Sequence, residues 1–238
     1  MHHLLSLIFS LESLPRAVEP LAHPPRSQEY HYKDDAVDMH FKVVVNLRAS
    51  TVERWIRVVK RRYLDAAPMK IVGLDCEFTD ATPEERQRAA VLQLSVATDT
   101  LVFHICHADR VPQALKDFLM DKTIKFCGAA INNDQRMLGP YGIHISSAVD
   151  LQRAVHPNPT YPNLPSLYTL ANVTIGTTLE KKKKNNNKKK KEDEKKKEEE
   201  ENLALGWGEF PLSFYHIKYA ALDARLGYEI ARRCLGAM

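Results

Sequence analysis

The sequence lacks several patterns that would place it in a common class of protein. None of its four cysteines forms a Cys-X-X-Cys pair, so their spacing suggests neither a zinc site nor a disulfide framework and is typical of reduced thiols inside a cell. No apolar run approaches the roughly 20 residues that span a bilayer, so we expect no membrane segment. No G-x-G-x-x-G or Walker-type loop is present, which excludes the familiar nucleotide-binding motifs. The cysteines are Cys76, Cys106, Cys127 and Cys234.

Excess charge of one sign is also missing from most of the chain. The formal net charge is +4, and residues 181–201 account for all of it with 11 lysines against seven acidic residues. The remaining residues therefore carry 23 basic and 23 acidic side chains, because the totals are 34 and 30. A global basic balance consequently offers no argument for nucleic-acid binding, and any electrostatic argument has to be local.

Two segments have compositions that do not favour a packed core. Residues 1–38 are rich in proline and histidine, and the short apolar stretch at 4–11 lacks the Lys/Arg flank and cleavage site of a signal peptide, so we predict a disordered or loosely ordered tail. Residues 181–201 are predicted to be a solvated insertion. A frayed Glu/Lys helix and a nuclear-import signal built on residues 181–184 and 188–191 remain alternatives.

Between these segments, hydrophobic periodicity predicts a mixed α/β domain over residues 39–238. Three strands follow the opening helix, and the turn-like residues 98–100 join the second to the third, which favours an antiparallel meander followed by crossover connections. A helix from about residue 52 should begin at an N-cap formed by Ser50 or Thr51. Strands are expected at 40–47, 70–78, 89–97, 101–106, 124–127 and 145–151, and helices at 52–63, 112–120, 131–138, 164–173 and 214–234.

The predicted strand at 70–78 contains two carboxylates in an otherwise apolar segment. Asp75 and Glu77 are two residues apart, so both side chains project to the same side of the strand. Two like charges held side by side require compensation, and a divalent cation such as Mg²⁺ with its hard oxygen ligands is the usual one. A D-x-E tripeptide is common on protein surfaces, and the apolar residues around this one make it a candidate metal site.

Two further segments offer acidic residues at suggestive positions. Tyr219 and Asp223 are spaced i, i+4 and therefore share one face of the last helix, next to alanines small enough for close packing. Asp134 lies near the start of the helix at 131–138, where the helix dipole favours an anion. Taken separately, the first pair could be a surface pair, and Asn133 or Asp134 could simply cap its helix.

Together, the three segments resemble the DEDD superfamily of 3′–5′ exonucleases, and the tyrosine in the last one resembles its DEDDy branch. The chain is most similar to the Werner-type and ribonuclease-D-type domains, especially small plant members, over about 190 residues from His40. The likeness includes VLQLS at 91–95, FCGAAINNDQRML at 126–138, the Trp207 and Pro211-Leu212 approach to the last helix, and IKYAALDARLGYEI at 217–230. It implies a ribonuclease H-like α/β fold, with a mixed sheet of five to six strands flanked by helices.

The resemblance also implies a catalytic mechanism. Members of this family hydrolyse phosphodiester bonds at a 3′ end and release nucleoside 5′-monophosphates with two divalent cations, Mg²⁺ or Mn²⁺. Carried over, Asp75 would bridge both cations, Glu77 and Asp223 would complete the first site, and Asp134 would hold the second through water. Tyr219 would orient the attacking water, together with Glu77.

The sequence leaves alternatives for the substrate, the partners and the compartment. Phe78 is a candidate for stacking on the terminal nucleotide, with a place in the core as an equal alternative. The partner is the 3′ end of DNA or RNA, undecided between them, and a recruiting protein partner is expected because no accessory nucleic-acid-binding module is apparent. The alternative to an exonuclease is a catalytically weak or silent adaptor on the same fold. We expect an intracellular protein, in the nucleus or alternatively in the cytoplasm.

Overall fold

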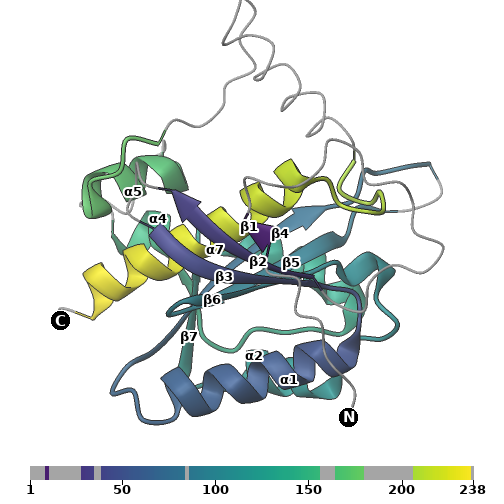
Figure 1. The fold of residues 1–238 in the computed structure, drawn as a ribbon, viewed down its shortest axis with the longest axis horizontal. Coiled ribbons are helices and arrows are strands. Elements are labelled where there is room, and N and C mark those ends of the chain that lie inside the picture. The colour runs from purple at the N-terminus through teal and green to yellow at the C-terminus, as the bar shows by residue number, and fades with distance from the viewer. Residues whose placement is uncertain are drawn as a thin grey trace, which may run out of the picture.

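The computed structural model of the chain describes residues 9–10, 28–34, 39–83, 86–155, 164–179 and 206–236. These residues form one mixed sheet with helices on both faces, which confirms the predicted α/β class (Figure 1). The charged insertion at 181–201 lies outside the described residues, so the expectations for it remain predictions. Within the described part, no helix is both long enough and apolar enough to cross a bilayer.

The elements follow the order that the sequence predicts, with a few additions. The α-helices are α1 (Ala49–Val59), α2 (Gln113–Met120), α3 (Ile131–Leu138), α4 (Leu151–Ala154), α5 (Leu167–Ile175) and α7 (Phe214–Leu235). A π-helical turn, η1 (Lys60–Leu64), follows α1, and two short 3₁₀-helices are η2 (Ile105–His107) and η3 (Gly139–Tyr141). The strands are β1 (Phe9–Ser10), β2 (Gln28–Asp34), β3 (Met39–Asn46), β4 (Lys70–Phe78), β5 (Ala89–Val96), β6 (Asp99–Phe103), β7 (Ile124–Gly128) and β8 (Ala148–Asp150).

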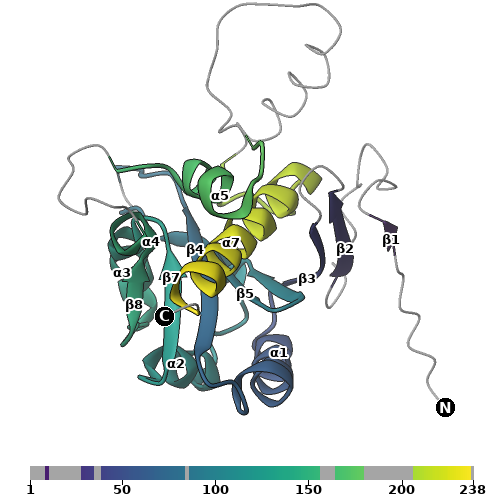
Figure 2. The same ribbon diagram turned by 90° about the vertical axis from the view of Figure 1, so that its left-hand side faces the viewer.

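The sheet combines an antiparallel meander with parallel crossovers. Its strand order is β1-β2-β3-β6-β5-β4-β7-β8, which Figure 2 shows from β1 on one side to β8 on the other. Strands β4, β5 and β6 are antiparallel neighbours, and the short turn between β5 and β6 predicts the antiparallel pairing of those two. Strand β7 runs parallel to β4, and β8 runs parallel to β7. The predicted meander followed by crossovers is therefore confirmed.

The predicted number of five to six strands is too low, because the described sheet has eight. Residues 28–34, which the sequence analysis places in the N-terminal tail, form strand β2 and pair antiparallel with β3. Tyr30 and Tyr32 are buried there, and the ring of Tyr32 stacks on Phe41 with ring centroids 4.6 Å apart. Two alternating tyrosines are only a weak local indication of a strand. Strand β2 is stabilised mainly by its pairing with β3, which the propensity of its own residues does not predict.

Helix α1 begins earlier than predicted, and its first turn is capped by a different residue. Its N-cap is Arg48, which makes no side-chain capping bond, so neither Ser50 nor Thr51 caps the helix. Instead the backbone N–H of Ala49 donates to Oδ1 of Asp109, at 2.8 Å. Because this acceptor lies 60 residues further along the chain, no local pattern could have revealed the true start of the helix.

The predicted strand at 145–151 is also shorter in the structure, where β8 covers only Ala148–Asp150. Asp150 ends it by capping the next helix, since its side chain accepts from the N–H of Gln152 at 3.0 Å. A carboxylate at this position favours a helix start over a longer strand. The short helix α4 follows directly as a result.

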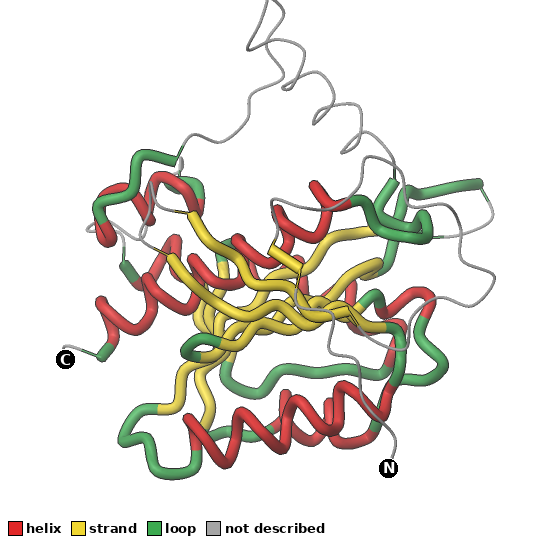
Figure 3. The backbone as a smooth tube through the Cα atoms, in the orientation of Figure 1, coloured by secondary structure: helices red, strands yellow, loops and turns green. Residues whose placement is uncertain are grey.

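Two hydrophobic layers enclose the sheet. Helices α1, α2 and α3 contribute to the core on one face, and α4, α5 and α7 to the core on the other. Figure 3 shows the strands as one layer between these helices. Helix α7 packs across β4, β5 and β6, and it approaches β4 very closely at Gly73. A Cβ at that position would lie 2.0 Å from the carbonyl oxygen of Ala224, so only glycine allows this approach.

Candidate active site

Strand β4 carries the first two candidate residues toward helix α7. The residues that alternate with them, Leu74 and Cys76, are buried in the core on the opposite face. Asp75 and Glu77 consequently project to the α7 side, and both keep intermediate exposure. The predicted shared face of the D-x-E pair is thus present.

Helix α7 brings the third acid to this pair. Carboxylate oxygens of Asp75, Glu77 and Asp223 all lie within 4.8 Å of one another, although the first two residues are far from Asp223 in the sequence. The close approach at Gly73 and the buried Ala220 and Ala224 allow the helix to lie low enough on the sheet for this. Three carboxylates at such a separation form a set of hard oxygen ligands for a divalent cation.

Asp134 lies beside this triplet without belonging to it. It occupies the first turn of α3, as predicted, and its side chain is 3% exposed. The N-cap of α3 is Ala130, so the alternative that Asn133 or Asp134 merely caps the helix does not apply. Its Oδ2 has no hydrogen-bond partner within the described residues. A buried carboxylate oxygen left without a partner is costly, which fits a group that serves a cation.

The charges of the four acids are strongly coupled. Burial raises the pKa of Asp75 well above its usual range, and the neighbouring carboxylates of Asp134, Asp223 and Glu77 raise it further. Burial also raises the pKa of Asp134 to about 8, with a contribution from Asp150. Four acids that oppose one another's ionisation need positive charge nearby, and two dications would balance them. The residues therefore fit the divalent cations that the resemblance implies.

We expect the stability of the cation-free protein to fall as the pH rises. The folded state binds protons more tightly than the unfolded chain at Asp75 and Asp134, because both pKa values are raised on folding. The stabilisation is full below the unfolded pKa of about 4 and is lost as the pH rises through about 8. Saturating Mg²⁺ should reverse the trend, since the cation binds the ionised carboxylates.

Thermal unfolding with EDTA and with Mg²⁺, over a series of pH values, tests this expectation. Asp134→Asn is the informative variant, because it removes one raised pKa and should flatten the curve recorded in EDTA. A melting temperature in EDTA that rises steadily between about pH 5 and about pH 8 would contradict the assignment of these acids as a mutually repelling cluster.

Tyr219 lies on the same helical face as Asp223, as the i, i+4 spacing predicts. Burial raises the pKa of Tyr219, the carboxylates of Asp223, Glu77 and Asp75 raise it further, and a hydrogen bond to Asp223 adds to this. The hydroxyl consequently stays protonated at neutral pH. It is a neutral donor next to the acidic triplet.

The structure adds residues that the sequence analysis missed. Burial raises the pKa of Tyr168 on α5, and its hydroxyl forms a hydrogen bond to Asp223. Asp150 acts on the pKa of Asp134 from the end of β8. Gln93 on β5 lies directly opposite Asp75. Only Gln93 gave a sequence signal, as a polar residue in an apolar strand, whereas contacts of the other two depend on long-range packing.

Phe78 takes an intermediate position between its two predicted roles. It is half-buried and packs against the core on the face of α1 and α2, with the register of the β4–β5 pair shifting between Glu77 and Phe78. The ring thus contacts the core while part of it stays accessible. Its role in stacking on a nucleotide stays a prediction.

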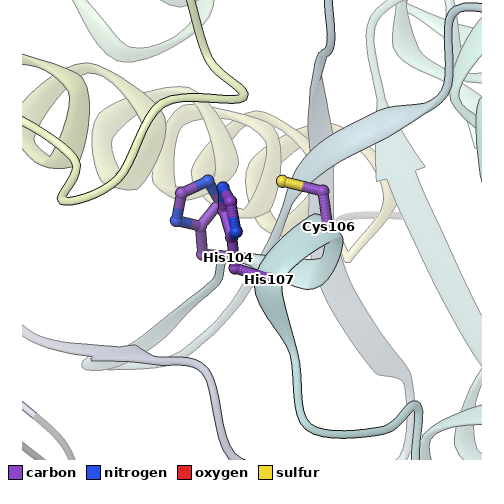
Figure 4. A group of neighbouring side chains, drawn as sticks. All are labelled: His104, Cys106 and His107. Atoms are coloured by element: carbon purple, nitrogen blue, oxygen red, sulfur yellow. The ribbon is translucent and has the colours of Figure 1, made fainter. Parts of the chain in front are cut away.

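A second group of ligand-type side chains lies at the end of β6. His104, Cys106 and His107 have ligand atoms within 4.8 Å of one another, and the sulfur of Cys106 points toward the imidazole rings (Figure 4). Nε2 of His104 lies 3.1 Å from the carbonyl oxygen of Trp207, and Nε2 of His107 lies 2.6 Å from that of Gly208. A carbonyl oxygen only accepts, so both Nε2 atoms carry a proton and donate.

These two hydrogen bonds hold the segment that leads into α7. They fix Trp207, whose ring lies 4.4 Å from the ring of His216 and 6.1 Å from that of Tyr219, between centroids. His216 in turn belongs to the capping box that starts α7 at Ser213. The end of β6 therefore supports the helix turn that carries Tyr219.

Comparisons with known proteins agree with this geometry. A family model described as 3′-5′ exonuclease matches residues 50–234. The chain is 30% identical over 166 residues to the bifunctional 3′-5′ exonuclease/ATP-dependent helicase WRN of Mus musculus, and 28% identical over 111 residues to exonuclease 3′-5′ domain-containing protein 2 of Drosophila melanogaster. These matches cover 68% and 46% of this chain.

The chain spans only 11% and 18% of the lengths of these two relatives. Among solved structures it is similar to Trypanosoma brucei RNase D, with a TM-score of 0.63 and 15% identity, over 82% of this chain and 64% of that one. A structure of the same RNase D in complex with RNA U12 gives a TM-score of 0.62 at 14% identity, over 82% and 62% of the two chains. At this identity the likeness concerns the fold.

Proposed function

Because this chain belongs to the 3′-5′ exonuclease family, whose fold is ribonuclease H-like, we propose that it hydrolyses the terminal phosphodiester bond at the 3′ end of a nucleic acid. The observation that carries the proposal is the convergence of Asp75 and Glu77 with Asp223, from two distant elements, within 4.8 Å. The product would be a nucleoside 5′-monophosphate.

Four acids would hold the two divalent cations. Asp75 is central, because the charges of all three other acids act on its pKa. Glu77 and Asp223 complete the triplet, and Asp134 on α3 offers an Oδ2 that has no hydrogen-bond partner within the described residues. When bound, two such cations activate a water and stabilise the charge on the attacking and leaving oxygens of an in-line displacement.

The chain's own residues orient the reacting groups. The hydroxyl of Tyr219 donates its one proton to Asp223 and can accept a hydrogen bond from the attacking water, and Glu77 can accept a second hydrogen bond from that water. Tyr168 donates to Asp223 and thereby limits the orientations of this ligand. Trp207 lies against the ring of Tyr219 and keeps that side chain in place.

DNA and RNA are both candidate substrates. The trypanosomal RNase D structure contains RNA, whereas the name of the mouse relative specifies neither DNA nor RNA. Discrimination depends on contacts to the 2′-hydroxyl. The substrate assay below therefore includes both nucleic acids.

A single-turnover nuclease assay tests the proposal. We expect 5′-labelled single-stranded DNA, single-stranded RNA or 3′-overhang DNA to shorten stepwise from the 3′ end in Mg²⁺ or Mn²⁺, and to stay intact in EDTA. The nucleic acid that shortens fastest identifies the preferred substrate. If none shortens although Mg²⁺ still raises the melting temperature, the adaptor alternative replaces the exonuclease.

A further inference from the structure

Gln93 has no structural explanation in the fold alone. Its side chain is 0% exposed, and neither Oε1 nor Nε2 has a hydrogen-bond partner in the part of the chain that the structure describes. A buried amide without partners is destabilising, and a well-packed apolar residue would avoid the cost. Packing therefore does not explain a glutamine at this position, whereas a role for its amide group would.

The strand register gives that amide a neighbour. In the antiparallel pair of β4 and β5, Gln93 lies directly opposite Asp75, so both side chains project to the α7 side of the sheet. Directly opposite residues have Cβ atoms about 5 Å apart, which brings the carboxylate of Asp75 within reach of the longer glutamine side chain. Helix α7 packs across both strands and excludes water from the amide.

The other buried polar pair on this face behaves differently. Ser95, two residues along β5, lies opposite Gly73 and hydrogen-bonds to Thr100 at 2.9 Å, so its hydroxyl has a partner. Gln93 pairs instead with Val102 on its β6 side, which offers no side-chain acceptor. Within the strand pairs that flank Gln93, the directly opposite acceptor is therefore the carboxylate of Asp75.

We infer that Gln93 is a positioning residue of the metal site. Because Nε2 makes no hydrogen bond in the part of the chain that the structure describes, a rotation of the side chain would bring its amide N–H to an oxygen of the ionised Asp75. This bond would fix the direction in which the carboxylate presents its other oxygen to a cation. Residues that hydrogen-bond to a metal ligand without touching the metal orient that ligand, and their removal lowers metal affinity by about 10- to 100-fold. This inference rests on the proposed function, because it assigns Gln93 a role toward the cations bound there.

The substitution Gln93→Met tests it, since methionine has a similar length and no amide. We expect the affinity for Mn²⁺, measured by calorimetric titration of the full chain, to fall about 10-fold. The melting temperature in EDTA should stay equal or rise, because an unpartnered buried amide is removed. Gln93→Leu serves as the second variant if methionine disturbs the packing.

Ser95→Ala is the matched control, from the same strand and the same face. It should lower the melting temperature, because Thr100 loses its partner, and leave the Mn²⁺ affinity unchanged. Gln93 variants that fold and bind Mn²⁺ as tightly as the original chain would overturn the role of Gln93 alone. An original chain that binds no Mn²⁺ would overturn the proposed function and this inference with it.

Discussion

Asp75→Asn is expected to reduce nuclease turnover by about 10³-fold or more, equivalent to about 4 kcal/mol of transition-state stabilisation. The reason is that Asp75 belongs to the triplet and its pKa responds to all three other acids. The same change should raise the melting temperature in EDTA by roughly 2–4 °C, since it removes one charge from a repelling cluster. Mg²⁺ should then stabilise the variant much less than the original chain.

The matched control for this variant is Asp117→Asn on α2. Asp117 is exposed and accepts a hydrogen bond from Gln113, away from the acidic triplet. Its replacement should leave turnover and the response to Mg²⁺ unchanged. Full activity in Asp75→Asn would remove the central ligand from the proposed mechanism, and loss of activity together with a lower melting temperature in EDTA would indicate misfolding.

Gly73→Ala should destabilise the protein by about 3 kcal/mol. The new Cβ would lie 2.0 Å from the carbonyl oxygen of Ala224 and 2.5 Å from the backbone nitrogen of Tyr228, and neither backbone atom can rotate away. Helix α7 would have to lift from β4, which would move Asp223 away from Asp75. The stabilisation by Mg²⁺ should therefore decrease along with the free energy of unfolding.

Gly139→Ala provides the control for backbone entropy. No atom outside its chain neighbours and helix backbone lies within 4 Å of a Cβ built at Gly139, whose φ is −52°. Pro140 follows, however, and disfavours this helical conformation for alanine. The entropic gain and the clash with Pro140 oppose each other, so this variant should lose about 1 kcal/mol at most, well below the loss expected for Gly73→Ala. Denaturant unfolding of both variants measures the contrast, and equal stabilities would show that the contact between α7 and β4 is looser than the distances indicate.

The acids were predictable because each one follows a local rule. The alternation along β4 places Asp75 with Glu77, and the helical period places Tyr219 with Asp223. The convergence of these pairs came from the family resemblance rather than from spacing. Local rules could not indicate Tyr168 or Asp150, because these residues reach the site through the packing of α5 and the position of β8.

Errors in the predicted fold have the same origin. Strand β2 depends on pairing with β3, and the start of α1 depends on Asp109 in a distant loop. In both cases the stabilising partner is far away along the chain. The predictions were correct where a segment's own period sufficed, as for β4, β5, α3 and α7.

The division of the candidate ligands between β4 and α7 also determines when the proposed site can form. Asp75 and Glu77 leave the ribosome well before Asp223, so the meander can pair while the third carboxylate is still unsynthesised. Joining the two requires closure of a loop of roughly 150 residues, an entropic cost that non-local contacts repay only late in folding. A nascent chain therefore has no complete cation site until α7 docks, and capture of a cation would report that folding is finished.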